Sequence, residues 1–283
     1  MSRCDKENGP SHWPNSDGAL CGAGQQSPID LCGALKLPND AKYRLTFANK
    51  NTPGKLTLET DGQAKIVPTD LWRKSYTVNS ADIGIKVGRQ AEGATDLTWQ
   101  LAQAHFHWGR AGRQDEGSEH YIEGVQHPLE IHFVHHNSKY ADLTAALASG
   151  NDDALLVVGQ CFEVDRTGAD LHVQTDTMTT LVSGIEKEAS TTEIEIAPYA
   201  MIDQSEGFYT YPGSLTTPTC NPVVTWIVMH KVAKIRSSTL DLFHDKTLDA
   251  DGKKVAVMPT LDVCLRRQLR LHAPNLLSWS LLG

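Results

Sequence analysis

Three histidines carry the clearest chemical signal in the sequence. His105 and His107 are two residues apart. On a β-strand such residues point to the same face, with their Cα atoms about 7 Å apart. His132 lies in a second strand-like run, and if the two strands were neighbours, three imidazoles would converge. Three protein ligands and one open position are typical of catalytic zinc. The pattern therefore indicates a metal site that suits zinc, with copper, cobalt or nickel as alternatives.

The same residues also have a purely structural explanation. Paired histidines on a strand often bind no metal, and the chain has 12 histidines in all. Glu130, two residues before His132, fits an ordinary cross-strand charge pair as well as a metal site. No P-loop and no GxSxG motif is present, which disfavours a phosphate site and a serine hydrolase. From the spacing alone, both the metal site and the structural explanation stay open.

Short β-like runs separated by Gly, Asn and Asp must position these histidines. Helical signals are few, and no internal repeat or long linker divides the chain. The first 34 residues are rich in Gly, Pro, Ser and Asn and predict an irregular N-terminal arm. We therefore expect a single, mainly β domain over residues 1–283 with short peripheral helices. The expected strands are 43–47, 55–59, 97–102, 129–134, 154–158 and 223–229, and the expected helices are 140–147 and 175–185.

Composition excludes several classes of function. With 26 Lys and Arg against 34 Asp and Glu, the formal net charge is −8, and no basic cluster is present. We therefore expect neither a nucleic acid nor an anionic membrane as partner. No apolar run approaches the roughly 18 residues of a membrane-spanning helix. The N-terminus has no apolar segment typical of a signal peptide, so the sequence is that of a cytosolic protein or of a mature secreted form.

Longer motifs around the histidines resemble the α-class carbonic anhydrases. The resemblance covers roughly residues 8–230 and weakens from about residue 245. It implies a large twisted, mostly antiparallel central sheet, with zinc at the bottom of a conical cleft. The motifs, in the order of that family, are Asn-Gly-Pro-Ser-His-Trp at 8–13, Gln-Ser-Pro-Ile-Asp at 26–30, Gln-x-His-Phe-His-Trp-Gly at 103–109, Gly-Ser-Glu-His at 117–120, Glu-Ile-His-Phe-Val-His at 130–135, Gly-Ser-Leu-Thr-Thr-Pro at 213–218 and Val-Thr-Trp at 224–226.

The resemblance implies a metal centre with outer hydrogen-bond partners. His105, His107 and His132 match the zinc ligands of the family, with one Zn²⁺ per chain. Gln103 and Glu130 match the residues that accept hydrogen bonds from His105 and His132. Such outer partners fix the tautomer and the orientation of ligating imidazoles.

Catalytic and substrate-binding residues follow from the same resemblance. Thr216 matches a hydroxyl that accepts a hydrogen bond from the hydroxide on zinc, and Glu119 matches the carboxylate that takes the Thr216 proton. Further residues match the wall of the cleft that binds the substrate, namely Thr217, Val134, Val157, Leu215 and Trp226.

The implied activity is reversible hydration of CO2 to bicarbonate and a proton, by attack of zinc-bound hydroxide. That makes the chain a zinc lyase, a carbonate dehydratase, and sulfonamides or anions would inhibit it at the zinc. Two other classes of protein fit the sequence less well. Inactive binding proteins that resemble carbonic anhydrases typically lack a ligand histidine, whereas all three are present here. A secreted protein that binds mineral or further metal is suggested by the acidity and the extra histidines, but no acidic repeat supports it.

Three departures from the family bear on mechanism. The proton-shuttle histidine is absent, and its position falls on Gly54 or Lys55. A lysine with a pKa near 10.4 is a poor shuttle at neutral pH, so we expect proton transfer to limit the rate. Cys4 replaces a Tyr that orders water in the cleft. Residues 257–264 lack the Asn-x-Arg-Pro-x-Gln pattern whose carbonyl holds one ligand, which leaves His107 without an expected outer partner.

Cysteines indicate the compartment. Cys21 and Cys220 match a disulfide of the secreted and membrane-bound members, which favours an extracellular protein over a cytoplasmic one. Six cysteines allow 15 pairings, and no CxxC pair is present. The remaining cysteines, which could pair internally, pair between chains or stay free, are Cys4, Cys32, Cys161 and Cys264. The sequence does not indicate an oligomeric state.

Overall fold

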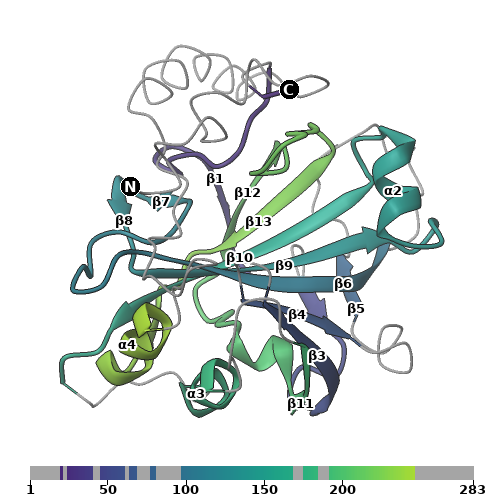
Figure 1. Cartoon of the computed structure of the whole chain (residues 1–283). Coiled ribbons are helices and arrows are strands. Elements are labelled where there is room, and N and C mark those ends of the chain that lie inside the picture. The colour runs from purple at the N-terminus through teal and green to yellow at the C-terminus, as the bar shows by residue number, and fades with distance from the viewer. Residues whose placement is uncertain are drawn as a thin grey trace.

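A mixed β-sheet dominates the computed structural model, and short helices lie at its sides (Figure 1). The predicted mainly β fold with short peripheral helices is confirmed. That residues 1–283 form a single domain, with 1–34 as an irregular arm, stays a prediction. The structure describes residues 20–21, 24–40, 45–60, 64–68, 77–80, 97–167, 175–183 and 191–245.

Twelve of the strands in these ranges join in one sheet, whose main order is β1-β12-β13-β10-β9-β6-β4-β3-β11. Strand β14 adds to β10, β5 adds to β6 and β2 pairs with β5, while β7 and β8 form a separate pair. The bounds are β1 (Leu35–Leu37), β2 (Leu45–Phe47), β3 (Gly54–Thr60), β4 (Ala64–Pro68), β5 (Thr77–Ser80), β6 (Leu97–Trp108), β7 (Tyr121–Ile122), β8 (Val125–Gln126), β9 (Leu129–Asn137), β10 (Leu155–Val164), β11 (Thr191–Ile196), β12 (Phe208–Gly213), β13 (Val224–Met229) and β14 (Ala233–Ile235).

The antiparallel pair β6–β9 forms the centre of the sheet. His105 lies directly opposite His132, and Gln103 lies opposite Val134. The register shifts between Leu101 and Gln103, so Ala102 is an extra residue on β6, as in a β-bulge. Directly opposed residues of antiparallel strands share a face. Gln103, His105 and His132 therefore lie on the same side of the sheet.

Strand β10 continues that face beyond β9. It runs antiparallel to β9 but parallel to β13 and β14. Val157 lies opposite both Val134 and Trp226, while Gly159 lies opposite His132. A Cβ atom on Gly159 would lie 3.0 Å from Glu130 Oε1, so this position leaves room for the carboxylate.

Local signals explain the helices α2 (Leu143–Ser149), α3 (Thr175–Ser183) and α4 (Ser237–Asp245). Helix α2 starts at Asp142, whose carboxylate accepts from the Ala145 N–H at 2.8 Å, and it ends at Gly150 with φ of 64°. These are a regular N-cap and a left-handed C-cap. Helix α3 agrees with the expected 175–185, whereas α4 has no counterpart among the predicted elements. Within the ranges given above, no helix has the length and apolar character needed to cross a membrane.

Candidate metal centre

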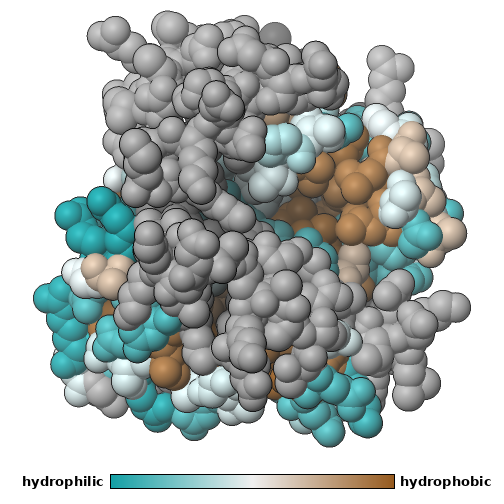
Figure 2. Space-filling view, viewed as in Figure 1, coloured by the Kyte–Doolittle hydropathy of each residue, from teal (hydrophilic) through white to brown (hydrophobic). Residues whose placement is uncertain are grey.

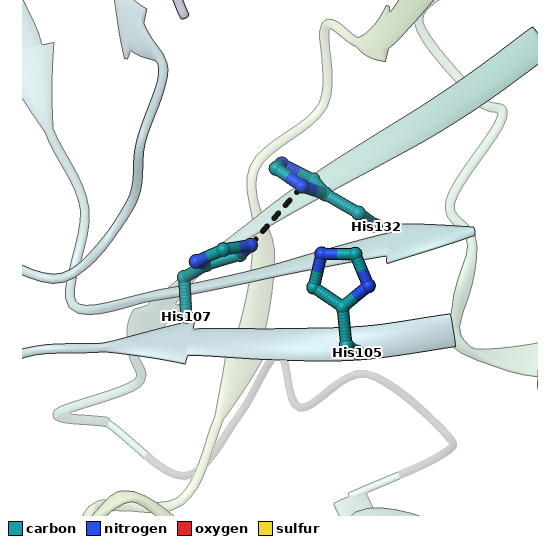
Figure 3. Close-up of side chains that lie close together, drawn as sticks. All are labelled: His105, His107 and His132. Carbon is teal, nitrogen blue, oxygen red and sulfur yellow. Dashed lines mark hydrogen bonds between the residues drawn. The ribbon is translucent and has the colours of Figure 1, made fainter. Parts of the chain in front are cut away.

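Three imidazoles converge on one point above the middle of the sheet. His105 and His107 come from β6, and His132 comes from β9 (Figure 3). One nitrogen of each ring lies within 4.8 Å of the other two. His107 Nε2 and His132 Nδ1 are 3.1 Å apart. The rings of His107 and His132 are about 1% exposed, so water does not compete strongly for these nitrogens.

Outer hydrogen bonds select which nitrogen each ring presents. His105 Nδ1 donates to Gln103 Oε1 at 2.8 Å, which leaves its Nε2 as the acceptor. His132 Nε2 donates to Glu130 Oε1 at 2.8 Å, which leaves its Nδ1 as the acceptor. The lone pairs of a neutral imidazole bind metals, and an outer acceptor fixes the tautomer.

His107 differs from the other two rings. Among the described residues, its Nδ1 is buried and has no hydrogen-bond partner. The segment 257–264, which departs from the family pattern at this point, lies outside the described residues, as does Cys4.

Electrostatics favour the neutral form of two of the rings, His107 and His132. Burial lowers the pKa of His107 well below its usual value, and the neighbouring His132 and His105 lower it further. Burial also lowers the pKa of His132, although Glu130 opposes this. Neutral imidazole is the form that binds a metal ion. Three neutral nitrogen ligands therefore fit a zinc ion.

The buried Glu130 carboxylate accepts four hydrogen bonds. Its Oε1 accepts from His132 Nε2 and, at 2.7 Å, from His120 Nδ1. Its Oε2 accepts from the backbone N–H groups of Glu119 and His120 at 2.8 and 2.9 Å. Burial raises the pKa of Glu130, but His120 and His132 outweigh burial and hold it well below its usual value.

A second group of possible metal ligands consists of Glu130 and the two histidines that donate to it. His120, Glu130 and His132 also bring one ligand atom each within 4.8 Å. In this second group Glu130 already accepts hydrogen bonds from both imidazoles, whereas in the group of His105, His107 and His132 the outer partners leave His105 Nε2 and His132 Nδ1 as acceptors. The all-histidine group is therefore the better metal centre.

Glu119 is buried close to the ligand nitrogens. Its Oε2 lies 3.6 Å from His107 Nε2 and 3.7 Å from His132 Nδ1. Burial and the nearby Glu130 raise the pKa of Glu119 well above its usual value, and the Thr216 hydroxyl lowers it by less. Within the described ranges neither Glu119 oxygen completes a hydrogen bond. The structure thus brings Glu119 and Thr216 together beside the three histidines.

An apolar wall lies next to this centre. Val134, Val157 and Trp226 belong to one buried cluster, and Leu215 packs against it. The Trp226 ring lies 4.8 Å from the His132 ring, measured between centroids. Figure 2 shows hydrophobic side chains gathered beside α2, whose Ala146 belongs to the same cluster. Thr217, in contrast, is exposed in the loop that follows Leu215.

The predicted disulfide between Cys21 and Cys220 is confirmed, and it spans 199 residues. Two of the other cysteines are described. Cys32 is free and exposed, while Cys161 is free and buried. Cys264 lies outside the described residues, so its pairing stays open.

Neither residue at the shuttle position offers an imidazole. Gly54 is buried at the start of β3, and Lys55 is exposed next to it. The Lys55 ammonium donates to Glu193 Oε1 on β11 at 3.1 Å.

Two residues behind the metal centre were missed from the sequence. His120 Nε2 lies 2.7 Å from the Tyr211 hydroxyl, so His120 joins Glu130 to β12, three places away in the sheet from β9. His120 lay within a recognised motif and could have been found there. Tyr211 carried no signal, because only the tertiary fold brings it behind the site.

Fold and site together define a class of protein, one with a mainly β structure whose central sheet presents a buried group of three histidines able to hold a metal ion. The family model of the eukaryotic-type carbonic anhydrases matches residues 8–274. The chain therefore belongs to the eukaryotic-type carbonic anhydrase family, and this membership supports carbonic anhydrase activity, the hydration of CO2.

Proposed function

We propose that this chain is a zinc enzyme that interconverts CO2 and bicarbonate, with its one ion held by His105, His107 and His132. The observation that supports this best is the convergence of three ring nitrogens on one point in a buried site. When bound, zinc would supply a Lewis acid that lowers the pKa of a coordinated water, an effect for which carbonic anhydrases are themselves the standard example.

In this proposal Thr216 and Glu119 orient the attacking oxygen. A bound dication would add positive charge close to Glu119 and favour its carboxylate form over the protonated form. If that carboxylate accepts the Thr216 proton, the Thr216 oxygen can act only as an acceptor. It then favours an attacking oxygen that still carries a proton and directs that oxygen's lone pair toward CO2.

The apolar wall would hold CO2 beside the ion. CO2 has no net charge and no dipole, so it is better accommodated by Val134, Val157, Leu215 and Trp226 than by polar groups. Exposed Thr217 would contact the more polar product at the opening. Sulfonamides and small anions are expected to compete for the position of the attacking oxygen.

Proton release would depend on the solvent. Gly54 has no side chain, and the Lys55 ammonium forms an ion pair with Glu193. We therefore infer that small buffers accept the proton. The disulfide supports secretion, because such bonds persist in oxidising compartments.

Metal analysis together with stopped-flow CO2 hydration tests this function. The wild type should hold one zinc per chain and hydrate CO2, whereas His107→Ala should lose both properties. His230→Ala is a matched control, since it removes a histidine that pairs with Glu206 away from the centre. More than one zinc per chain would favour a protein that binds additional metal. One zinc without hydration would leave a binding protein of the same fold.

A further inference from the structure

The Ser27 side chain lies where two parts of the site meet. Its Oγ accepts from the Ser214 N–H at 3.0 Å, and its own N–H donates to Ser214 Oγ at 2.9 Å. The Tyr211 hydroxyl is also 3.0 Å from Ser27 Oγ. The backbone approaches so closely that a Cβ on Gly213 would lie 2.2 Å from Ser27 Oγ, and only glycine fits there.

From Ser27 a chain of hydrogen bonds leads to a ligand. The Tyr211 hydroxyl lies between Ser27 Oγ and His120 Nε2. It has one proton, so it donates to one of these neighbours and accepts from the other. His120 Nδ1 and His132 Nε2 then meet at the same oxygen of Glu130. His132 can present Nδ1 to a metal only while its Nε2 donates to Glu130. The hydrogen bonds that start at Ser27 therefore help to determine which nitrogen of His132 acts as the ligand.

A second connection leads from Ser27 to the loop that carries Thr216. Ser214, which exchanges two hydrogen bonds with Ser27, stands two residues before Thr216. Its carbonyl accepts from Trp226 Nε1 at 3.0 Å, which fixes the loop to the apolar wall. At the other end of the loop, the Leu20 N–H donates to the Thr219 carbonyl at 3.0 Å. The segment that contains Ser27 therefore holds this loop at both ends.

We propose that Ser27 is a positioning residue, which couples the Thr216 loop to the hydrogen bonds that orient His132. The Ser27 hydroxyl forms hydrogen bonds with both Ser214 and Tyr211. Its value for catalysis rests on the proposed function, but the coupling itself is a property of the folded chain.

Two substitutions distinguish the connection from Ser27 to His132 from the connection to the Thr216 loop. Ser27→Ala removes the hydroxyl that serves both connections, whereas Tyr211→Phe removes only the hydroxyl that links Ser27 to His120 and leaves the Ser27–Ser214 pair. Ser149→Ala is a matched control, because that hydroxyl bonds the Ala146 carbonyl in α2. All variants are made in the full chain.

Three measurements report on the coupling. Ser27→Ala should speed amide exchange at Ser214 about tenfold, since that N–H loses its acceptor. It should also change the ring-nitrogen NMR signals of His120, because the Tyr211 hydroxyl that bonds His120 loses its contact with Ser27. Zinc release to a chromophoric chelator should be up to about tenfold faster, at the low end of effects for outer partners of ligands. Tyr211→Phe should reproduce the His120 and zinc effects but leave Ser214 exchange unchanged, and the double variant should release zinc no faster than either single one.

Ser149→Ala should give wild-type values in all three measurements. If Ser27→Ala also gave wild-type values in all three, the proposal would be overturned. The proposal would also be overturned if the effects of Ser27→Ala and Tyr211→Phe on zinc release added up in the double variant. Additive effects would mean that Ser27 does not act through Tyr211. NMR and amide exchange are recorded on metal-free protein. They therefore test Ser27 even if the protein binds no zinc or fails to hydrate CO2, which would refute the proposed function instead.

Discussion

His105 and His132 face each other directly across β6 and β9, yet they offer different ring nitrogens to the same point. Gln103 accepts from Nδ1 of His105, which leaves Nε2 as the acceptor, whereas Glu130 accepts from Nε2 of His132, which leaves Nδ1 as the acceptor. Because of this difference, two residues at equal height on adjacent strands can approach one ion without their rings colliding. The outer partners, and not the strand geometry alone, set the shape of the centre.

Replacing Glu130 by Gln should weaken zinc binding. The amide has only one good acceptor oxygen for the four donors that Glu130 now serves, and its NH2 group faces other donors. We expect zinc affinity to fall about 10- to 100-fold, measured by competition with a chelator. Glu163→Gln is the control, because Glu163 lies at the edge of β10 near Lys234. Equal affinity in wild type and Glu130→Gln would contradict the role of this carboxylate.

Thr216→Val should separate catalysis from metal binding. Valine keeps the shape of threonine but can neither donate to Glu119 nor accept from the attacking oxygen. The rate of CO2 hydration should fall about 10²-fold with zinc content unchanged, in line with the loss of one well-placed hydrogen bond. Thr216→Ser should recover most of the rate. An unchanged rate in Thr216→Val would remove Thr216 from the mechanism.

The rate of hydration should rise with imidazole concentration. Without an internal histidine at position 54 or 55, the step that returns a proton to solvent is slow until a buffer accepts it. Lys55→Ala should have the same rate as wild type at every imidazole concentration, because the Lys55 ammonium is paired with Glu193. A rate independent of buffer would point to another internal path.

Sequence alone was informative where a local pattern decides the structure. Alternation put His105 and His107 on one face, and the local pattern predicted a helix at 140–147, where α2 lies. It could not show that His105 lies opposite His132, because register depends on the bulge at Ala102. Nor could it reveal Tyr211, which reaches His120 only because β12 packs beside β13 in the sheet.

Acid should destabilise the fold through His135. Burial lowers its pKa to about 3, while its Nδ1 donates to the Leu156 carbonyl and its Nε2 accepts from Tyr199. Unfolded His135 takes up a proton below about pH 6.5, but folded His135 does not until about pH 3. As the pH falls from about 6.5 to about 3, His135 therefore lowers the free energy of unfolding by about 1.4 kcal/mol per pH unit.

The variant His135→Phe/Tyr199→Phe should reduce that slope by one proton, since it removes the histidine without orphaning the tyrosine. Urea unfolding at several pH values between 3 and 6.5 measures it, and Tyr199→Phe alone is the control. A slope equal to that of the control would show that His135 titrates normally in the folded state.

Loss of the disulfide should cost stability. Cys21 and Cys220 are 199 residues apart, and the chain-entropy model assigns such a crosslink about 5 kcal/mol. Cys21→Ser/Cys220→Ser should therefore unfold at lower urea, whereas Cys32→Ser, at an exposed free thiol, should not. A double variant as stable as wild type would show that the contacts of Ser27 and Leu20 suffice to hold the loop.

The distances along the chain imply an order of assembly. His107 and His132 are separated by 25 residues and meet through one antiparallel strand pair. Thr216 lies 84 residues beyond His132, in the loop before β13, and that loop is crosslinked to Cys21 over 199 residues. Contacts close in sequence cost less loop entropy and form earlier. A chain still emerging from the ribosome would thus possess its ion-binding pocket well before the parts that make the pocket reactive.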